Sequence, residues 1–286
     1  MKKKLLVLTL AAITAFSTLF TGCGKKDDGV TVVHVGARYD DVEVWEAVNE
    51  NLKPYNIRVE NKAYDSSVNL NDLVLSGDID LNVAQHYAYY DYIKAQDNKY
   101  SKLNAIGEIS ISTIDLYSNK YDSIDDLPDG AVIAIPNDIN NGGRALSVLE
   151  KSGLIKLADD HGDIPLQEDI VENPKNIKFE EIATSSMISI LDDVDAGFVY
   201  SPNASDAGLN PADDAIFRDE LDLKNNPTQS KFIIIFTGEE GDENNEVYKR
   251  IIEEYHKENV FKAYKSEYKG STVPVVDGEA IDLSQY

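Results

Sequence analysis

Cysteine is almost missing from this chain of 286 residues, which contains a single one, Cys23. One chain with one cysteine cannot form an internal disulfide, so the folded state has to be held by a hydrophobic core. Basic residues are also scarce, since 27 Lys and Arg stand against 51 Asp and Glu, for a formal net charge of −24. A surface this acidic argues against binding to nucleic acid and to anionic lipid headgroups.

The motifs of common enzyme classes are absent as well. The sequence has no Gly-x-Ser-x-Gly elbow, no phosphate-binding Gly-x-x-x-x-Gly-Lys loop and no Gly-x-Gly-x-x-Gly fingerprint. The four histidines, at positions 34, 86, 161 and 256, show no short metal-binding spacing, and the acidic segment 241–246 lacks the EF-hand pattern. These absences favour binding over catalysis, and we expect no enzyme activity, no cofactor and no resident metal.

The N-terminus carries an export signal. Three lysines, residues 2–4, precede an apolar run from Leu5 to Phe20, which is too short for a spanning helix. The run ends at Thr21-Gly22-Cys23, which resembles a bacterial lipobox although Leu19 lies one place early. The resemblance implies that residues 1–22 are cleaved off and that acyl chains such as palmitate, attached at Cys23, hold the protein on the extracytoplasmic face of the cell membrane. Ordinary secretion with a free thiol is the alternative. Residues 23–29 are predicted to form a solvated tether.

Strand and helix signals alternate along the rest of the chain. Apolar or β-branched runs predict strands at 30–35, 57–61, 79–83, 131–135, 177–182 and 196–200. Amphipathic segments predict helices at 42–52, 69–75, 89–95, 144–151, 185–191 and 245–264. Two further apolar runs, 109–117 and 232–236, are interpreted as strands that cross between two lobes. The alternation predicts an α/β fold with a mostly parallel sheet in each lobe.

One stretch, residues 77–92 (GDIDLNVAQHYAYYDY), combines a strand end with a group of polar aromatic side chains. Ligands of such sheets bind beyond the carboxyl ends of the strands, which places residues 36–41 and 84–90 on one rim. His86 and Tyr89 are therefore candidate ligand contacts. Two alternatives stay open: Tyr89 lies at helical spacing from Tyr92 and Ile93 and suits the buried face of a helix, and His86 suits a buried hydrogen-bonding group.

Arg144 is the most informative single residue. It is predicted to lie in the first turn of a helix, after Asn140 and Asn141, where the positive end of the helix dipole disfavours a cation. An anion bound at the same position would stabilise an arginine there. Backbone N–H groups and a guanidinium together can bind a carboxylate. The alternative is an arginine that is solvated or paired with a nearby acid.

Three segments together resemble the NlpA/MetQ family of methionine-binding lipoproteins, the substrate-binding subunits of ABC importers. They are GDIDLNVAQHYAYYD, LYSNKYDSIDDLPDGAVIAIPNDINNGGRALSVLEKSGLIKL and LDDVDAGFVYSPNASDAGLNPADDAIF. The resemblance runs from about Val32 to the C-terminus. It implies a two-lobed periplasmic-binding-protein-like fold with two crossing strands, in which residues 30–112 plus 232–286 form lobe I and residues 113–231 form lobe II.

The resemblance also assigns the site. His86 and Tyr89 fall on the histidine and tyrosine of the family motif Phe-Phe-Gln-His-x-Pro-Tyr, Arg144 on the arginine that holds the ligand carboxylate, and Asn141 on an asparagine of the same loop. The family phenylalanines are replaced by Val83 and Ala84.

Where the family reads Asn-Gly-Asn-Tyr, this chain has Tyr200-Ser201-Pro202-Asn203, so Tyr200 and Asn203 are the expected contacts there.

The resemblance implies a lipid-anchored receptor that captures methionine or a related amino acid between its lobes and delivers it to an ABC permease and its ATPase. Because the side-chain pocket is altered, a different amino acid or a dipeptide is the first alternative. A metal-binding receptor of similar architecture and a surface lipoprotein without a transport role are less favoured, and an enzyme is least favoured.

Overall fold

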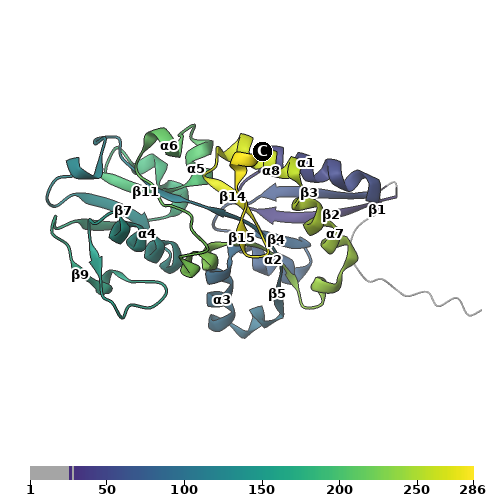
Figure 1. Ribbon diagram of the computed structural model, residues 1–286. Coiled ribbons are helices and arrows are strands. Elements are labelled where there is room, and N and C mark those ends of the chain that lie inside the picture. The colour runs from purple at the N-terminus through teal and green to yellow at the C-terminus, as the bar shows by residue number, and fades with distance from the viewer. Residues whose placement is uncertain (1–25, 28) are drawn as a thin grey trace, which may run out of the picture.

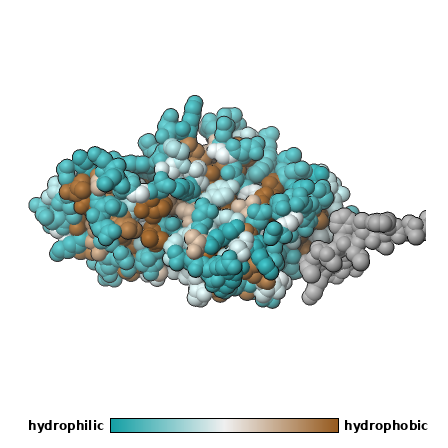
Figure 2. Space-filling view, turned by 90° about the horizontal axis from the view of Figure 1, so that it is seen from below, coloured by the Kyte–Doolittle hydropathy of each residue, from teal (hydrophilic) through white to brown (hydrophobic). Residues whose placement is uncertain are grey.

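The computed structural model describes residues 26–27 and 29–286, so the predicted signal and Cys23 lie outside the described residues. The chain forms two α/β lobes side by side, each built on its own sheet (Figure 1). Both lobes are hydrophobic inside, and the face shown in Figure 2 is largely hydrophilic. Within the described part of the chain, no helix has the length and apolar character needed to cross a membrane.

The larger sheet forms lobe I and has eight strands, in the order β1-β2-β4-β13-β5-β14-β15 with β3 beside β2. Its strands are β1 (Lys26–Asp27), β2 (Val30–Ala37), β3 (Ile57–Ala63), β4 (Leu81–His86), β5 (Leu103–Ser112), β13 (Ile234–Glu239), β14 (Thr272–Val276) and β15 (Glu279–Ala280). The predicted strands at 30–35 and 57–61 are confirmed and run parallel to each other. The third begins at Leu81 rather than Ile79 and pairs in parallel with β2. The prediction of a mostly parallel sheet is wrong for this lobe, because the remaining pairs of neighbouring strands in it are all antiparallel.

Helices cover both faces of this sheet. They are α1 (Val42–Leu52), α2 (Leu70–Ser76), α3 (Tyr87–Gln96), α7 (Glu246–Tyr255) and α8 (Glu258–Tyr268). Helices α1, α7 and α8 share one hydrophobic core with β2 and β3, and α2 and α3 share another on Ile79, Leu103 and Ile235. The prediction of one helix over 245–264 is wrong, because the chain breaks at His256 and Lys257 and α8 starts afresh.

The smaller sheet forms lobe II in the order β10-β7-β11-β6-β12. Its strands are β6 (Ile114–Tyr117), β7 (Val132–Pro136), β10 (Lys178–Ile182), β11 (Ala196–Tyr200) and β12 (Ala215–Phe217), and a separate pair is formed by β8 (Lys156–Leu157) and β9 (Ile170–Glu172). Its helices are α4 (Ile139–Lys151), α5 (Ser201–Asp206) and α6 (Pro211–Asp214). The helix predicted at 185–191 is instead two 3₁₀ turns, Thr184–Ser186 and Ile188–Ile190.

The chain passes between the sheets twice. The predicted strand over 109–117 is divided into β5 and β6 at Thr113, whose hydroxyl donates to Asp115 at 2.6 Å and whose carbonyl accepts from the Ser201 amide at 3.2 Å. Thr113 therefore belongs to neither strand, and its bond to Ser201 places the end of β5 beside the start of α5. The return passage is a 3₁₀ segment, Pro227–Phe232, that leads into β13. The two segments that cross between the lobes, at Thr113 and at Pro227–Phe232, therefore border the region between them.

Candidate functional site

Helix α4 carries Arg144 into the region between the lobes. The helix begins at Ile139 and not at Arg144 as predicted, because the Asp138 carboxylate accepts a hydrogen bond from the Asn141 amide at 2.9 Å and caps the first turn. Arg144 consequently lies deeper in the helix than the first turn. Its side chain is 4% exposed.

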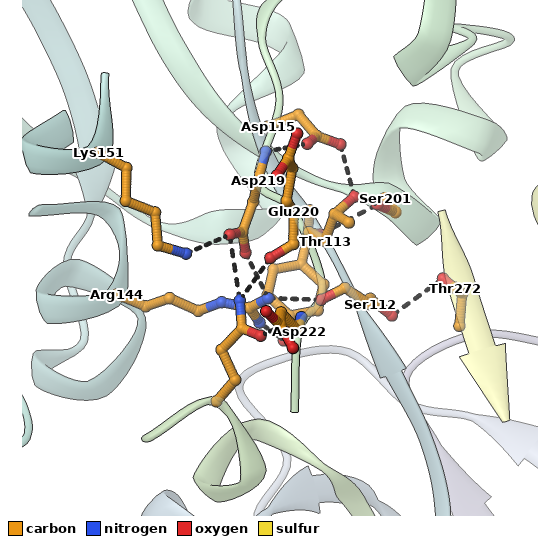
Figure 3. Close-up of polar contacts among 12 residues, drawn as sticks. Ser112, Thr113, Asp115, Arg144, Lys151, Ser201, Asp219, Glu220, Asp222 and Thr272 are labelled. Carbon is orange, nitrogen blue, oxygen red and sulfur yellow. Dashed lines mark hydrogen bonds and ion pairs between the residues drawn. The ribbon is translucent and has the colours of Figure 1, made fainter. Parts of the chain in front are cut away.

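The guanidinium of Arg144 already has an anionic partner within the chain. Its Nη2 lies 2.8 Å from Oδ2 of Asp219, and the two side chains are 4% and 1% exposed (Figure 3). Nη2 also donates to the Ser112 carbonyl at 2.7 Å, and Nη1 donates to the Tyr200 hydroxyl at 3.3 Å. Of the sequence alternatives for Arg144, the structure shows the arginine paired with an acid.

Asp219 is held as firmly as Arg144. Its Oδ1 accepts from Nζ of Lys151 at 3.1 Å, and its backbone N–H donates to Asp115 at 2.8 Å (Figure 3). Gln229 adds a long contact to the same carboxylate at 3.4 Å. Arg144 and Lys151 thus both pair with the buried carboxylate of Asp219. The negative charge of this carboxylate compensates the cost of burying the guanidinium.

Aromatic rings cover the remaining sides of Arg144. The ring centre of Phe232 lies 4.9 Å from its Cζ, and that of Tyr200 lies 5.8 Å away, distances typical of cation–π contacts. Nε of Arg144 is buried and has no hydrogen-bond partner among the described residues. Nη1 makes a single bond, to Tyr200, so Nε–H and one N–H of Nη1 are the donors that have no acceptor among the described residues.

His86 approaches Arg144 from lobe I. Its ring packs edge-on against Phe232, with ring centres 5.2 Å apart, so Phe232 contacts both the histidine and the arginine. Burial lowers the pKa of His86 to about 4, and Asp138 opposes this shift. The neutral imidazole accepts the Tyr89 backbone N–H on Nδ1 at 3.1 Å and so caps α3. This matches the alternative interpretation of His86 as a buried hydrogen-bonding group.

The other predicted site residues lie near Arg144 and His86, but they do not all contact one another. Asn141 donates to Asp138 at 3.1 Å and lies close enough to His86 to influence the pKa of its imidazole. Asn203 accepts from the hydroxyl of Tyr39 at 2.8 Å and so joins lobe II to lobe I. Tyr89 is 36% exposed at the start of α3.

Two cavities lie along the rim formed by the ends of β2 and β4. A cavity of about 250 Å³ borders Tyr89, and most of its wall is polar, with Ser66, Asn69, Asn71, Asn82 and Gln85 among its residues. A smaller cavity of about 60 Å³ lies between the lobes, where Tyr200 and Pro202 of lobe II face lobe I. Arg38 and Ala84 line both. The predicted rim of residues 36–41 and 84–90 is thus confirmed.

The wall of the interlobe cavity is rich in aromatic side chains and contains one acid, Asp41. Besides Tyr200, the cavity is lined by Tyr39, Asp41, Trp45 and Tyr268. The Tyr268 hydroxyl donates a hydrogen bond to Asp41, and burial, together with neighbouring acids, raises the pKa of Asp41 to about 6. No Lys, Arg or His of the described chain forms an ion pair with Asp41.

Sequence reasoning missed Asp41, Asp219 and Phe232. Asp219 is separated from Arg144 by a long stretch of chain and lies outside helices and strands, so no spacing links the two. Asp41 follows a strand end on the predicted rim, and this position is the one signal that could have found it. As for metals, the described residues contain no group of three or more His, Cys, Asp or Glu side chains arranged to hold an ion.

Comparison with known proteins confirms the resemblance. The model of the NlpA lipoprotein family matches residues 33–276. The D-methionine-binding lipoprotein MetQ of Salmonella typhimurium is 35% identical over 273 residues, which cover 93% of this chain and 97% of that protein.

Solved structures share the fold over most of the chain. A nutrient-binding protein from Burkholderia cenocepacia, bound to methionine, superposes with a TM-score of 0.76 at 32% identity and covers 85% of this chain and all 100% of its own. The substrate-binding protein of a methionine transporter from Streptococcus pneumoniae superposes with a TM-score of 0.74 at 29% identity, covering 86% of this chain and 96% of its own.

Proposed function

Since the chain belongs to the NlpA lipoprotein family, we propose that it is the substrate-binding protein of an ABC importer and captures an amino-acid-like ligand between its lobes. Relatives of this chain bind methionine or serve a methionine transporter, and they match it over nearly its whole length. The proposed role is binding and delivery rather than catalysis. An ABC permease and its ATPase are the partners that this role requires.

The observation that carries the proposal is the cavity between the lobes. Its wall combines Tyr39 and Trp45 of lobe I with Tyr200 and Pro202 of lobe II, so a molecule bound there contacts both lobes. Its volume of about 60 Å³ is roughly the share of two water molecules, too small for a whole amino acid. We therefore propose that the ligand enters while the lobes are further apart and extends from this cavity past Ala84 toward Tyr89.

The ligand is proposed to be an amino acid, with methionine as the first candidate and another amino acid or a dipeptide as the alternative. Val83 and Ala84 leave more room than the phenylalanines of the family motif, and Tyr200 replaces an amide with a ring. Both changes alter the wall that faces the ligand side chain. His86, Tyr89, Asn141 and Asn203 remain the proposed supporting residues around it.

Attachment to the membrane is proposed to occur through acyl chains on Cys23. The lipobox-like end of the signal supports this proposal, as does membership of a lipoprotein family. The short tether then holds the binding lobes near the permease on the extracytoplasmic face of the membrane.

Thermal unfolding of the mature protein with Cys23→Ser, which prevents lipidation, tests the binding role. The protein is melted alone and with each common amino acid, both enantiomers of methionine, and dipeptides. A ligand at about 100 times its Kd stabilises the fold by roughly 2.7 kcal/mol. For a protein of this size the melting temperature then rises by about 5–10 °C.

A second measurement makes a negative result informative. The purified protein is unfolded, and any small molecule it releases is identified by mass spectrometry before the refolded protein is melted again. If no compound raises the melting temperature and no small molecule is released, the binding role is wrong and the non-transport lipoprotein is favoured.

A further inference from the structure

Two segments from different lobes meet beside the interlobe cavity. They are the loop of residues 38–41, which joins β2 to α1 in lobe I, and helix α5 in lobe II, and where they meet is called the interlobe contact below. A hydrogen bond crosses it, from the Tyr39 hydroxyl to Oδ1 of Asn203, at 2.8 Å. Helix α5 also lies against α8 of lobe I (Figure 1). The interlobe contact therefore exists only while the lobes are close together.

The loop of the interlobe contact is fixed on lobe I. The Asn61 side chain donates to the carbonyls of Tyr39 and Asp40, at 3.2 and 2.8 Å. The Tyr268 hydroxyl donates to Asp41, whose backbone adopts a left-handed conformation with a φ of 44°. That conformation is costly for a residue other than glycine and persists only where its surroundings hold it. The Tyr39 hydroxyl is thus presented to lobe II from a loop with a defined shape.

Helix α5 is fixed to the first crossing between the lobes. The Ser201 amide donates to the Thr113 carbonyl at 3.2 Å, and the Ser201 hydroxyl donates to the same carbonyl at 3.0 Å. Asn203 and Asp206 follow in this helix, three residues apart, so their side chains lie on the same face of it. Because Asn203 faces the loop of lobe I, Asp206 is directed to the same side.

Three acids face one another across the interlobe contact, Asp40 and Asp41 on the loop and Asp206 on the helix. Burial and then the charge of Asp40 raise the pKa of Asp206, and Asp206 is among the acids that raise the pKa of Asp41. None of the three forms an ion pair within 4.0 Å with a Lys, Arg or His of the described chain. Arg38, in the same loop, donates instead to the carbonyls of residues 64, 65 and 68 in lobe I. Repulsion between the acids grows as the lobes approach, so it opposes closure.

We propose that the interlobe contact sets how tightly this protein holds its ligand: the Tyr39–Asn203 hydrogen bond is a latch that keeps the lobes closed, and the charge of Asp206, facing Asp40 and Asp41, opposes it. The inference rests on the proposed function only in taking the lobes to open and close around a ligand. The apparent Kd of a ligand varies inversely with the fraction of protein in the closed form. Asn203 and Asp206 do not line the interlobe cavity, yet through this fraction they determine the affinity.

The test measures the distance between the lobes in ligand-free protein. Cys23→Ser removes the single cysteine of the chain, so two introduced cysteines are the only labelling sites. Ser266→Cys on α8 of lobe I and Ser185→Cys in lobe II are both exposed and take a fluorescent donor and acceptor. Unfolding and refolding remove bound ligand, and single-molecule energy transfer then gives the ratio of closed to open molecules.

The variants change one side chain of the interlobe contact at a time. Asn203→Ala removes the acceptor of the latch, and Tyr39→Phe removes its donor and keeps the ring. Asp206→Asn removes the opposing charge and keeps the side-chain shape. Asp193→Asn is the matched control for that charge, because Asp193 is an exposed acid of the same lobe that precedes β11, at the opposite end of this strand from α5.

The expected changes have opposite signs. Asn203→Ala and Tyr39→Phe each lower the ratio of closed to open molecules about fivefold, the typical share of one hydrogen bond, and combining them lowers it no further. Asp206→Asn raises the ratio about two- to threefold at about 10 mM salt. The increase disappears at about 1 M salt, where the Debye length is about 3 Å, and Asp193→Asn matches the wild-type protein at both. Calorimetry with the amino acid that most raises the melting temperature shows Kd changing in step with the ratio.

Other outcomes separate this inference from the function it rests on. If Asn203→Ala leaves the ratio of closed to open molecules unchanged, the latch is overturned even where affinity falls, because Asn203 then acts on the ligand directly. An Asp206→Asn protein that behaves like Asp193→Asn at low salt overturns the opposing charge. Both results are obtained without ligand, so they leave the proposed function in place. If no amino acid or dipeptide binds the wild-type protein, the proposed function is wrong, while the distances still decide the role of the interlobe contact.

Discussion

At the scale of single residues, the pairing of Arg144 with Asp219 changes how the sequence is interpreted. An arginine near the start of a helix predicts an anion, and the structure supplies one from the same chain, at 2.8 Å. Pairing with a nearby acid was one of the two alternatives that the sequence left open, but which acid it is depends on a loop whose path no local pattern specifies. A buried guanidinium that has an internal carboxylate contributes to folding, and its contribution is measurable.

We expect Asp219→Asn to destabilise the protein by about 3–5 kcal/mol, because it leaves the Arg144 charge buried with a neutral partner. Urea unfolding followed by circular dichroism measures the change. Glu220→Gln removes an exposed charge from the adjacent position and serves as the control, with an expected effect within about 0.5 kcal/mol. Equal stability of the Asp219→Asn and Glu220→Gln proteins would contradict a structural role for the pair. The double change Arg144→Met with Asp219→Leu should recover most of the loss.

The pH dependence of stability is a second prediction about a single residue. Burial raises the pKa of Asp41 to about 6, above the ordinary value of 3.8. The folded protein therefore binds the proton of Asp41 more tightly than the unfolded chain does. The resulting contribution to the free energy of unfolding is fully present below about pH 4 and is lost as the pH rises through 6. Other titratable groups act on Asp41 or respond to it; they are Tyr39, Asp40, Asp206, Tyr255, Tyr264, Glu267 and Tyr268.

We expect ligand-free Asp41→Asn to gain stability over the wild-type protein as the pH rises from 4 to 7, by about 2 kcal/mol. Part of the gain comes from Glu267, since burial first and Asp41 second raise the pKa of that carboxyl to about 7. Thermal melts across this pH range, made after unfolding and refolding to remove ligand, give the difference. A difference between the two proteins that is the same at every pH would show that Asp41 titrates normally in the folded state.

At the scale of helices and strands, the sequence predicted most of the framework. The pattern at 42–52 predicted α1 with its observed bounds, because Val44, Trp45, Val48 and Leu52 recur at helical spacing and pack into one core. The predictions failed where neighbouring elements decide the local structure. The segment 185–191 is apolar enough for a helix, yet it forms two successive 3₁₀ turns, and the residues that follow them, Met187 and Leu191, are buried in the lobe II core. The division of the predicted strand 109–117 at Thr113 likewise depends on a contact distant in sequence, the hydrogen bond from the Ser201 amide.

The start of α4 gives a prediction at this scale. The Asp138 carboxylate caps the helix, accepting from the Asn141 amide and its side-chain Nδ2. Asp138→Ala should lower stability by about 1 kcal/mol, and Asp138→Asn, which retains a capping oxygen, by much less. Chemical unfolding of both variants measures the difference. If both changes cost the same, the carboxylate charge and not the cap is what stabilises this end of α4.

At the scale of the whole molecule, the resemblance predicted two lobes and two crossings, and the similarity to solved structures confirms that architecture. The division at 112/113 and 231/232 remains a prediction, although the two sheets are built from strands on either side of it. The face drawn in Figure 2 is largely hydrophilic, in keeping with the large excess of acidic residues in the chain. What the sequence left open was how the lobes meet, because that depends on side chains brought together from distant segments, such as Tyr39 and Asn203.

The bond from Arg144 to the carbonyl of Ser112 has a mechanical meaning. Ser112 ends β5 in lobe I, Arg144 lies on α4 in lobe II, and the chain passes from one lobe to the other at Thr113. If the lobes swing open while this bond is kept, every point on α4 must move along an arc centred close to Ser112. The arginine then acts as the pivot, and the Tyr39–Asn203 hydrogen bond, which also joins the two lobes, has to lengthen as they separate.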